Sequence, residues 1–402
     1  MKKLISLLLV GLTLSAAALE RGSAGRVRYV VRTDPDWDRF TRGASRNTQE
    51  WFRSHVWRMM VYSSYWDDKL SWYPNAWAYI NLYAIYQDSD EAKRHPEWIL
   101  HDRQGKKLYI PWGCRDGTCP QYAANIADPG YRAQWIRAAR ELSKKGYKGL
   151  WIDDVNLEFQ IGDGSGKRAA PMMRTGGSEM SWDDWRRSIA EFTEQIRSTF
   201  RDMEILHNAI WFAGGAKRDA DPFVKRELAS ADYINLERGV TDSGLRGGDG
   251  EWSLRAFFSY IDRLHKLGKG VVLDNMGGKI EYSTASYFLV SSGVDAMGDQ
   301  GLRPDHWWAG LAVDLGEPRG MREDWRGLIR RKFSKGVVLV NPPDSAPAQL
   351  RLTGEFRRAD GSDAGKSLTI APADGVIMLG SGAIPANVDK AIQVNPTGPV
   401  RQ

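Results

Sequence analysis

The sequence contains few of the residues that build metal sites, redox centres and nucleotide sites. Its 402 residues include six histidines and two cysteines, and no H-x-H or H-E-x-x-H pair occurs, which argues against a zinc or two-metal hydrolase. The G-x-S-x-G elbow of serine hydrolases is missing. So are the G-x-G-x-x-G and P-loop patterns that bind nucleotides. We therefore expect no metal and no cofactor.

Clustered positive charge and long apolar runs are also missing. The formal net charge is +6, but the basic residues are spread along the chain, whereas a nucleic-acid-binding face concentrates them. Residues 1–18 combine two lysines, an apolar run and an A-x-A site, which predicts a signal peptide and export to the periplasm or outside the cell. No later window has the roughly 18 apolar residues of a membrane span. No feature indicates an oligomeric state.

The two cysteines, Cys114 and Cys119, lie five residues apart, with no histidine or further cysteine nearby. In an exported protein this spacing predicts a disulfide that pins a loop. The pair falls in an interval of about 60 residues between two predicted strands, and connections of that length often build substrate sites.

Short β-branched or aromatic runs alternate with amphipathic stretches, the pattern of repeated β/α units. The expected strands are Val27–Arg32, Val56–Tyr62, Ala78–Tyr86, Lys148–Asp154, Glu204–Ile210, Tyr233–Glu237, Gly270–Asp274 and Gly293–Met297. The clearest helical patterns are Pro129–Lys145, Trp182–Phe200 and Ser253–Leu267. Eight such strands predict a (β/α)₈ TIM barrel over residues 26–330.

After about residue 330 strands follow one another without helices, which predicts a small C-terminal β-sandwich-like module over residues 331–380. Residues 381–402 are polar with scattered proline and glycine, and we expect them to form a disordered tail.

In such a barrel the chemistry lies at the carboxyl ends of the strands. The fourth strand ends in Asp153 and Asp154, and the sixth ends in Glu237. Side chains alternate along a strand, so one of the two aspartates should face the barrel mouth and the other the helix layer or a loop. Periodicity does not decide which. Two carboxylates across a pocket match glycoside hydrolysis, with one as general acid and the other as nucleophile or base.

The sequence has 17 tryptophans and 15 tyrosines, and some of these rings are expected to stack on sugars. Candidate pocket walls are Trp66, Trp112, Trp151 and Trp211, although a core position explains each of them equally well. His207 and Asn208 could either bond a sugar hydroxyl or orient an acidic neighbour, and Asn235 and Asp274 are further candidate substrate contacts. A loop-stabilising role is equally consistent with Asp274.

Several segments together resemble a known family. They are Lys144-Lys-Gly-Tyr-Lys-Gly-Leu-Trp-Ile-Asp-Asp-Val-Asn156, Asn125-Ile-Ala-Asp-Pro-Gly-Tyr-Arg132, Ile234-Asn-Leu-Glu237, Leu273-Asp-Asn275 and Gly336-Val-Val-Leu-Val-Asn-Pro342. Over most of residues 50–380 the chain is similar to glycosyl hydrolase-like family 15, a group related to the α-galactosidase-type barrels.

The resemblance implies that the fourth-strand aspartate is the nucleophile and that the sixth-strand acid is the acid/base. Carried over by position, these are Asp153 and Glu237, with Asp154 open as the nucleophile through a one-residue shift. Many relatives have aspartate on the sixth strand, so Glu237 departs from the pattern. We therefore expect a secreted, two-carboxylate, retaining glycoside hydrolase acting on a polysaccharide or oligosaccharide. The alternative is a non-catalytic glycan-binding barrel for cell-envelope or exopolysaccharide assembly.

Overall fold

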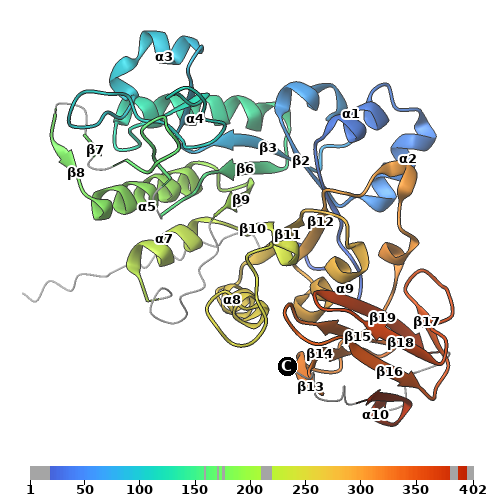
Figure 1. The fold of residues 1–402 in the computed structure, drawn as a ribbon. Helices are drawn as coiled ribbons and strands as arrows, with labels where there is room; N and C mark the ends of the chain where they lie inside the picture. The colour runs from blue at the N-terminus through green and yellow to red at the C-terminus, as the bar shows by residue number, and fades with distance from the viewer. Residues whose placement is uncertain are drawn as a thin grey trace, which may run out of the picture.

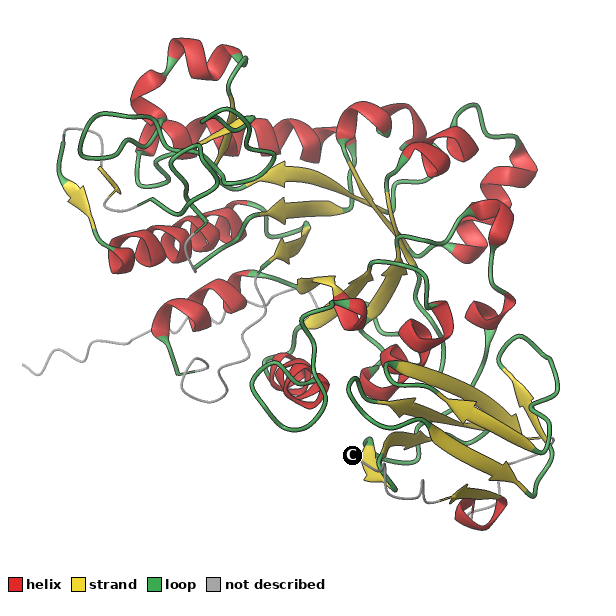
Figure 2. Ribbon diagram, in the orientation of Figure 1, coloured by secondary structure: helices red, strands yellow, loops and turns green. Residues whose placement is uncertain are grey.

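The computed structural model describes residues 19–157, 160–169, 172–173, 177–209, 220–380 and 388–395. The predicted signal peptide and Trp211 lie outside these residues. Figure 1 shows a barrel with surrounding helices, followed by a separate group of strands near the C-terminus. The helices and strands are distinguished by colour in Figure 2.

Eight parallel strands form the barrel, in the order in which they follow along the chain. They are β1 (Val30–Arg32), β2 (Arg58–Val61), β3 (Ala76–Asn81), β6 (Gly149–Asp153), β9 (Glu204–Asn208), β10 (Tyr233–Arg238), β11 (Gly270–Asn275) and β12 (Ala296–Asp299). A parallel bridge between Tyr29 and Met297 joins the first strand to the last. The predicted (β/α)₈ barrel is therefore confirmed.

The third predicted strand was too long. The barrel strand ends at Asn81, and β4 (Ala84–Tyr86) leaves the barrel to pair with β5 (Gln121–Ala123). Asn81 causes the break, because its Oδ1 accepts hydrogen bonds from the backbone N–H groups of Tyr83 and Ala84 and so turns the chain as an Asx motif does.

The helices between the strands begin and end where local chemistry predicts. In α4 (Pro129–Lys145), the side chain of Asp128 caps the first turn and Gly146, with φ of 96°, ends the helix. In α5 (Trp182–Thr199), Ser181 and Asp184 form a capping box. The other helices are α1 (Pro35–Thr41), α2 (Arg46–His55), α3 (Asp90–Arg94), α7 (Pro222–Ser230), α8 (Leu254–Lys266), α9 (Ile280–Val290) and α10 (Val388–Ala391).

The barrel interior is filled by one side chain from each strand: Val30, Met60, Trp77, Trp151, Leu206, Tyr233, Val272 and Ala296. Below this layer Arg58 pairs with Glu204 at 2.9 Å. A packed interior of this kind is a core and not a channel, so a ligand is restricted to the strand ends.

The C-terminal module contains two antiparallel sheets. One has β13 (Glu323–Trp325), β14 (Leu328–Lys332), β15 (Gly336–Asn341), β19 (Asp374–Gly380) and β17 (Phe356–Arg358), and the other has β18 (Ser367–Ile370), β16 (Ala348–Leu352) and β20 (Ile392–Asn395). The module packs against the barrel helix α9, where Arg331 donates hydrogen bonds to the backbone oxygens of Phe288 and Ser291.

The module differs from the expectation at both ends. Its first strand begins at Glu323, before residue 331. Residues 388–395, expected in a disordered tail, form α10 and β20, and β20 pairs with β16. The reason is Ile392, which is fully buried in the core of the module. The apolar segment around Ile392 becomes buried only when the rest of the module folds around it. It is too short to stand out as a strand from the polar residues on both sides of it in the sequence.

Candidate active site

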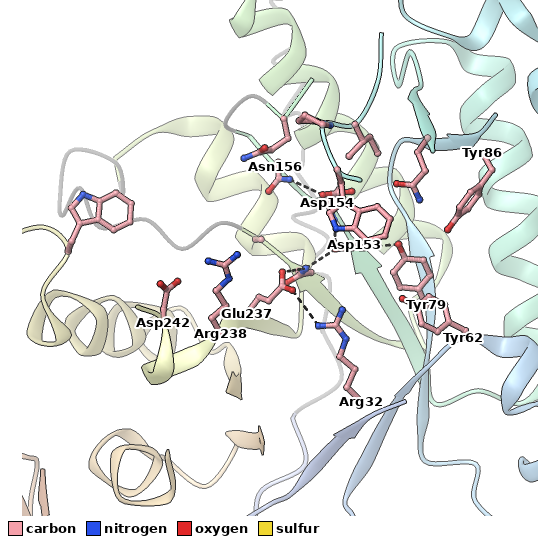
Figure 3. A pocket seen from close by; sticks show the side chains of 18 residues that line it. Arg32, Tyr62, Tyr79, Tyr86, Asp153, Asp154, Asn156, Glu237, Arg238 and Asp242 are labelled. Atoms are coloured by element: carbon pink, nitrogen blue, oxygen red, sulfur yellow. Dashed lines mark hydrogen bonds and ion pairs between the residues drawn. The ribbon is translucent and has the colours of Figure 1, made fainter. Parts of the chain in front are cut away.

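A cavity of about 630 Å³ opens at the carboxyl ends of the barrel strands. Its walls come from the ends of β1, β2, β3, β6, β9 and β10 and from the loops that follow them. Asp153, Asp154 and Glu237 all line this cavity, and Figure 3 shows their carboxylates lying close to one another. The carboxylates expected from the sequence are therefore brought together.

Asp153 ends β6 and is held from two sides. Its Oδ2 accepts a hydrogen bond from the Tyr79 hydroxyl at 2.9 Å, and its Oδ1 accepts one from Asn208 Nδ2 at 2.7 Å. The backbone N–H of Asp154 also donates to Oδ1 at 2.9 Å. Three donors fix the direction of the carboxylate oxygens, which is the preparation that a nucleophile or an electrostatic group needs.

Asp154 also faces the cavity, which strand alternation did not predict. Its φ is 56°, so the chain leaves the extended conformation at this residue and the side chain turns back toward the mouth. Asn81 Nδ2 donates to Oδ2 at 2.6 Å and Asn156 Nδ2 donates to Oδ1 at 3.2 Å. A non-glycine residue with positive φ is uncommon and is concentrated at functional sites.

The pKa of the Asp154 carboxyl is raised to about 7. Burial is the largest cause, and the negative charge of Asp153 is the second. The hydrogen bond from Asn81 opposes both, and the charge of Glu237 adds to the rise. Two neighbouring carboxyls thus have different environments, an arrangement that separates charged and protonated roles near neutral pH.

Glu237 lies across the mouth from Asp153, on β10. Its Oε2 accepts a hydrogen bond at 3.3 Å from Asn208 Nδ2, the same nitrogen that donates to Asp153 Oδ1. Because both contacts end on one atom, the two carboxylate oxygens are at most about 6 Å apart. The convergence expected from the strand positions is therefore present. Asn235 Nδ2 donates to Asn208 Oδ1 at 3.0 Å and so orients the amide of Asn208 from below.

Arg32 at the end of β1 connects Glu237 to a second carboxylate. Its Nη1 lies 3.4 Å from Glu237 Oε1 and 3.2 Å from Asp274 Oδ2. Asp274 is almost completely buried, and burial raises the pKa of its carboxyl while Arg32 lowers it. Removal of the guanidinium would leave Asp274 without its cation. Asp274 does not line the catalytic cavity. It is connected to the residues of the cavity through its contact with Arg32.

Besides Asp274, four predicted substrate contacts do not line the cavity: Trp66, Trp151, His207 and Asn235. Trp66 is buried, packs between Phe52 and Tyr73, and donates to the backbone oxygen of Tyr73. His207 faces the helix layer, where Nδ1 lies 2.6 Å from Oε1 of the equally buried Glu227 on α7. Trp151 belongs to the barrel interior beneath the cavity.

The alternation of side chains along each strand explains these positions. His207 precedes Asn208 on β9, so the two residues must point to opposite sides of the strand. Trp151 shares a side with Asp153 but lies one pleat deeper in the barrel. Asn235 is likewise buried beneath Asn208 and does not line the cavity. Strand periodicity identified the right strands but not the depth of each residue in the barrel.

Trp112 does line the cavity. It lies on the loop that contains the Cys114–Cys119 disulfide, and its side chain is 69% exposed. Tyr86 and Trp252 also line the cavity and are exposed. Exposed rings at the rim of a polar cavity present apolar faces on which a sugar ring can stack.

Several residues of the site had not been singled out from the sequence. They are Arg32, Tyr62, Tyr79, Asn81, Asn156, Tyr86, Arg238, Asp242 and Trp252. One signal was available, since Arg32 ends a predicted barrel strand as a polar residue after an apolar run. Asn81 lay inside the predicted strand Ala78–Tyr86. Tyr62, Asn156, Asp242 and Trp252 lie outside the barrel strands, and strand periodicity does not report the conformation of loops.

Within the described part of the chain, no group of three or more histidine, cysteine, aspartate or glutamate side chains is arranged to hold a metal ion. Among the same residues, no helix has the length and apolar composition needed to cross a membrane.

No protein-family model matches the chain, and no curated protein matches it in sequence. The glycoside hydrolase domain of PelA from Pseudomonas aeruginosa is similar in structure, with 14% identity and a TM-score of 0.40 over 69% of this chain and 95% of that one. Trehalose-6-phosphate hydrolase from Bacillus licheniformis has 9% identity and a TM-score of 0.48 over 88% and 99% of the two chains. An α-galactosidase AgaA variant from Geobacillus stearothermophilus has 9% identity and a TM-score of 0.47 over 89% and 56%.

These structural neighbours are glycoside hydrolases, and at such identities the likeness concerns the fold alone. The resemblance to glycosyl hydrolase-like family 15 stays a prediction.

Proposed function

We propose that this protein is a glycoside hydrolase that cleaves O-glycosidic bonds of a polysaccharide or oligosaccharide with Asp153 and Glu237. The observation that supports this most strongly is the shared contact at Asn208, which limits the separation of the two carboxylate oxygens to about 6 Å. Retaining glycosidases keep their two carboxyl groups about 5 to 5.5 Å apart, whereas inverting enzymes need roughly 6.5 to 9.5 Å to admit a water molecule. The distance favours retention.

In the proposed first step, Asp153 attacks the anomeric carbon and forms a covalent bond to it. The bond from that carbon to the leaving oxygen breaks, and the protonated carboxyl of Glu237 gives its proton to this oxygen. In the second step Glu237, now a carboxylate, takes a proton from water. The water oxygen bonds to the anomeric carbon and Asp153 is released.

The contacts of each carboxylate support this division of roles. Asp153 accepts three hydrogen bonds, which hold its carboxylate oxygens in a fixed position for attack. The side chain of Glu237 is 47% exposed, so it can exchange protons with water between the two steps. Arg32 contacts Glu237, but its charge is shared with Asp274 on the other side.

In this proposal Asp154 is not the nucleophile but assists Asp153. Its carboxyl accepts from Asn81 and Asn156, whereas Asn208 donates to Asp153 and Glu237. With a pKa of about 7, Asp154 is partly protonated at neutral pH and can donate a hydrogen bond to a sugar hydroxyl.

A direct test compares wild type with Asp153→Asn and Glu237→Gln on a panel of defined polysaccharides, with released reducing ends as the readout. Asp90→Asn and Glu141→Gln are matched controls, because both side chains are exposed on helices α3 and α4. We expect product from wild type and the controls, and a loss of at least about 100-fold in both site variants. Equal release by all five proteins would refute the assignment. Binding without turnover by wild type would instead support a glycan-binding barrel.

We also propose that the chain is exported, on the basis of the signal-like residues 1–18. Fractionation of cells that express the full sequence tests this point. A shortened protein in the periplasm or medium supports export, and a full-length protein that stays in the cytoplasm contradicts it.

A further inference from the structure

A second hollow of about 360 Å³ lies beside the catalytic cavity, at the ends of β1, β11 and β12. Arg32 and Tyr62 line both hollows, so the two spaces meet at these side chains. Pockets of roughly 300 to 1,000 Å³ accommodate small ligands, and both volumes fall in that range. The catalytic roles proposed above use no residue that lies only in the second hollow.

The polar groups of this hollow combine donors and acceptors in a small space. Gln300 Nε2 donates to Asp274 Oδ1 at 3.2 Å, and the other oxygen of Asp274 faces Arg32. Arg303 lies 2.7 Å from Asp34 Oδ2. Each sugar hydroxyl both donates and accepts, so a wall that alternates amide, guanidinium and carboxylate groups suits a polyhydroxylated ring.

Both guanidinium groups that line the hollow already face carboxylates. Asp274 is paired with Arg32, and Asp34 is paired with Arg303. The remaining acid, Asp299, accepts hydrogen bonds from the backbone N–H of Gly301 at 3.0 Å and from the Ser283 hydroxyl at 3.4 Å. The charged side chains that line the hollow therefore already have polar partners, and none is left to bind the charge of a uronic acid or an amino sugar. A neutral hexopyranose fits this wall best.

We infer that the second hollow is a subsite for a neutral hexopyranose unit of the same glycan chain whose bond is cleaved at Asp153 and Glu237. The inference rests on the proposed function, and it adds that a chain long enough to pass Arg32 and Tyr62 is the preferred substrate. A small glycoside occupies only the catalytic cavity and gains nothing from the second one.

Gln300→Leu tests the subsite, because it keeps the size of the side chain and removes its polar group. Gln349→Leu on the exposed face of β16 is the matched control. The probes are cellohexaose, maltohexaose, mannohexaose and chitohexaose, each compared with the p-nitrophenyl glycoside of the same sugar. We expect Gln300→Leu to raise KM for the cleaved hexasaccharide roughly tenfold, the effect of one lost hydrogen bond of about 1.4 kcal/mol, and to leave hydrolysis of the aryl glycoside unchanged.

Failure of the subsite can be distinguished from failure of the proposed function. If wild type cleaves a hexasaccharide but Gln300→Leu changes neither substrate, or changes both equally, the subsite is refuted and the hydrolase stands. Calorimetric binding of the same hexasaccharides to Asp153→Asn, with and without Gln300→Leu, is independent of turnover. Binding that weakens about tenfold without any cleavage by wild type supports the subsite and refutes the hydrolase. The absence of both binding and cleavage for all four hexasaccharides refutes both.

Discussion

Asp153 and Glu237 accept hydrogen bonds from one and the same nitrogen, Nδ2 of Asn208, at 2.7 and 3.3 Å. Asp153 and Asn208 end β6 and β9, and Glu237 is the last residue but one of β10. The three strands are neighbours in the barrel, so the amide lies on the strand between the two acids. Its own oxygen accepts from the buried Asn235, which fixes the amide with its nitrogen toward the carboxylates. The barrel therefore sets the separation of the two acids through a single side chain.

Replacement of Asn208 by leucine removes this link while keeping the volume of the side chain. We predict that Asn208→Leu lowers kcat about 100-fold, because a misplacement of about 1 Å in a catalytic group has an effect of that size. The measurement is steady-state kinetics on the polysaccharide that wild type cleaves, with Asn47→Leu on the exposed surface of α2 as control. Unchanged kcat in a folded Asn208→Leu protein would show that the link has no catalytic role.

The raised pKa of Asp154 predicts a pH-dependent stability. A carboxyl whose pKa is about 7 in the folded protein and 3.8 when unfolded binds more protons when folded, so the free energy of unfolding falls as pH rises between these values. Asparagine does not titrate. We predict that Asp154→Asn gains stability relative to wild type between pH 5 and pH 8, by on the order of 2 kcal/mol.

Urea unfolding of both proteins at the two pH values measures this difference. A difference between wild type and Asp154→Asn that stays constant from pH 5 to pH 8 would contradict the raised pKa, whatever the absolute stability of the variant.

Arg32 lies between Glu237 and the buried Asp274. Arg32→Gln should lower the free energy of unfolding by about 3 kcal/mol, because it leaves a buried carboxylate without its cation. Arg32→Lys should lose less, since it keeps the charge but not the planar fork. Adding Asp274→Asn to Arg32→Gln should restore part of the loss, which a double-mutant cycle measures by denaturation. Additive effects of the two substitutions would show that the pair is not coupled.

The sequence left two roles open for His207, a contact to a sugar hydroxyl or a contact to an acidic neighbour, and the structure shows the second. The ring of His207 meets Glu227 on α7, and both side chains are fully buried. We predict that His207→Leu lowers the free energy of unfolding by about 2 kcal/mol, because it leaves the buried Glu227 unsatisfied. KM should not change. A raised KM at unchanged stability would place His207 at the substrate after all.

The sequence was sufficient to predict the barrel, because each strand is a short apolar run and each long helix has its own caps. It also located Asp153 and Glu237, since an acidic residue at the end of an apolar strand stands out from its neighbours. It did not predict Asp154 in the cavity, because the positive φ at that residue breaks the alternation on which the argument depended. Nor did it reveal Arg32 as the link to Asp274, since the first and seventh strands approach each other only once the barrel has closed.

We propose that Asp153 is the nucleophile of a retaining glycoside hydrolase, and a trapped covalent intermediate would identify this residue. This assignment is tested most directly by mass spectrometry of the protein after reaction with the 2-deoxy-2-fluoroglycosyl fluoride of the sugar that wild type releases. Such a reagent slows the second step, so a covalent glycosyl-enzyme accumulates if the mechanism is retaining. We predict a single glycosyl group attached to the peptide that contains Asp153, on that residue, and none in Asp153→Asn. A glycosyl group on Asp154, or no adduct in a protein that hydrolyses the parent glycan, would contradict the assignment.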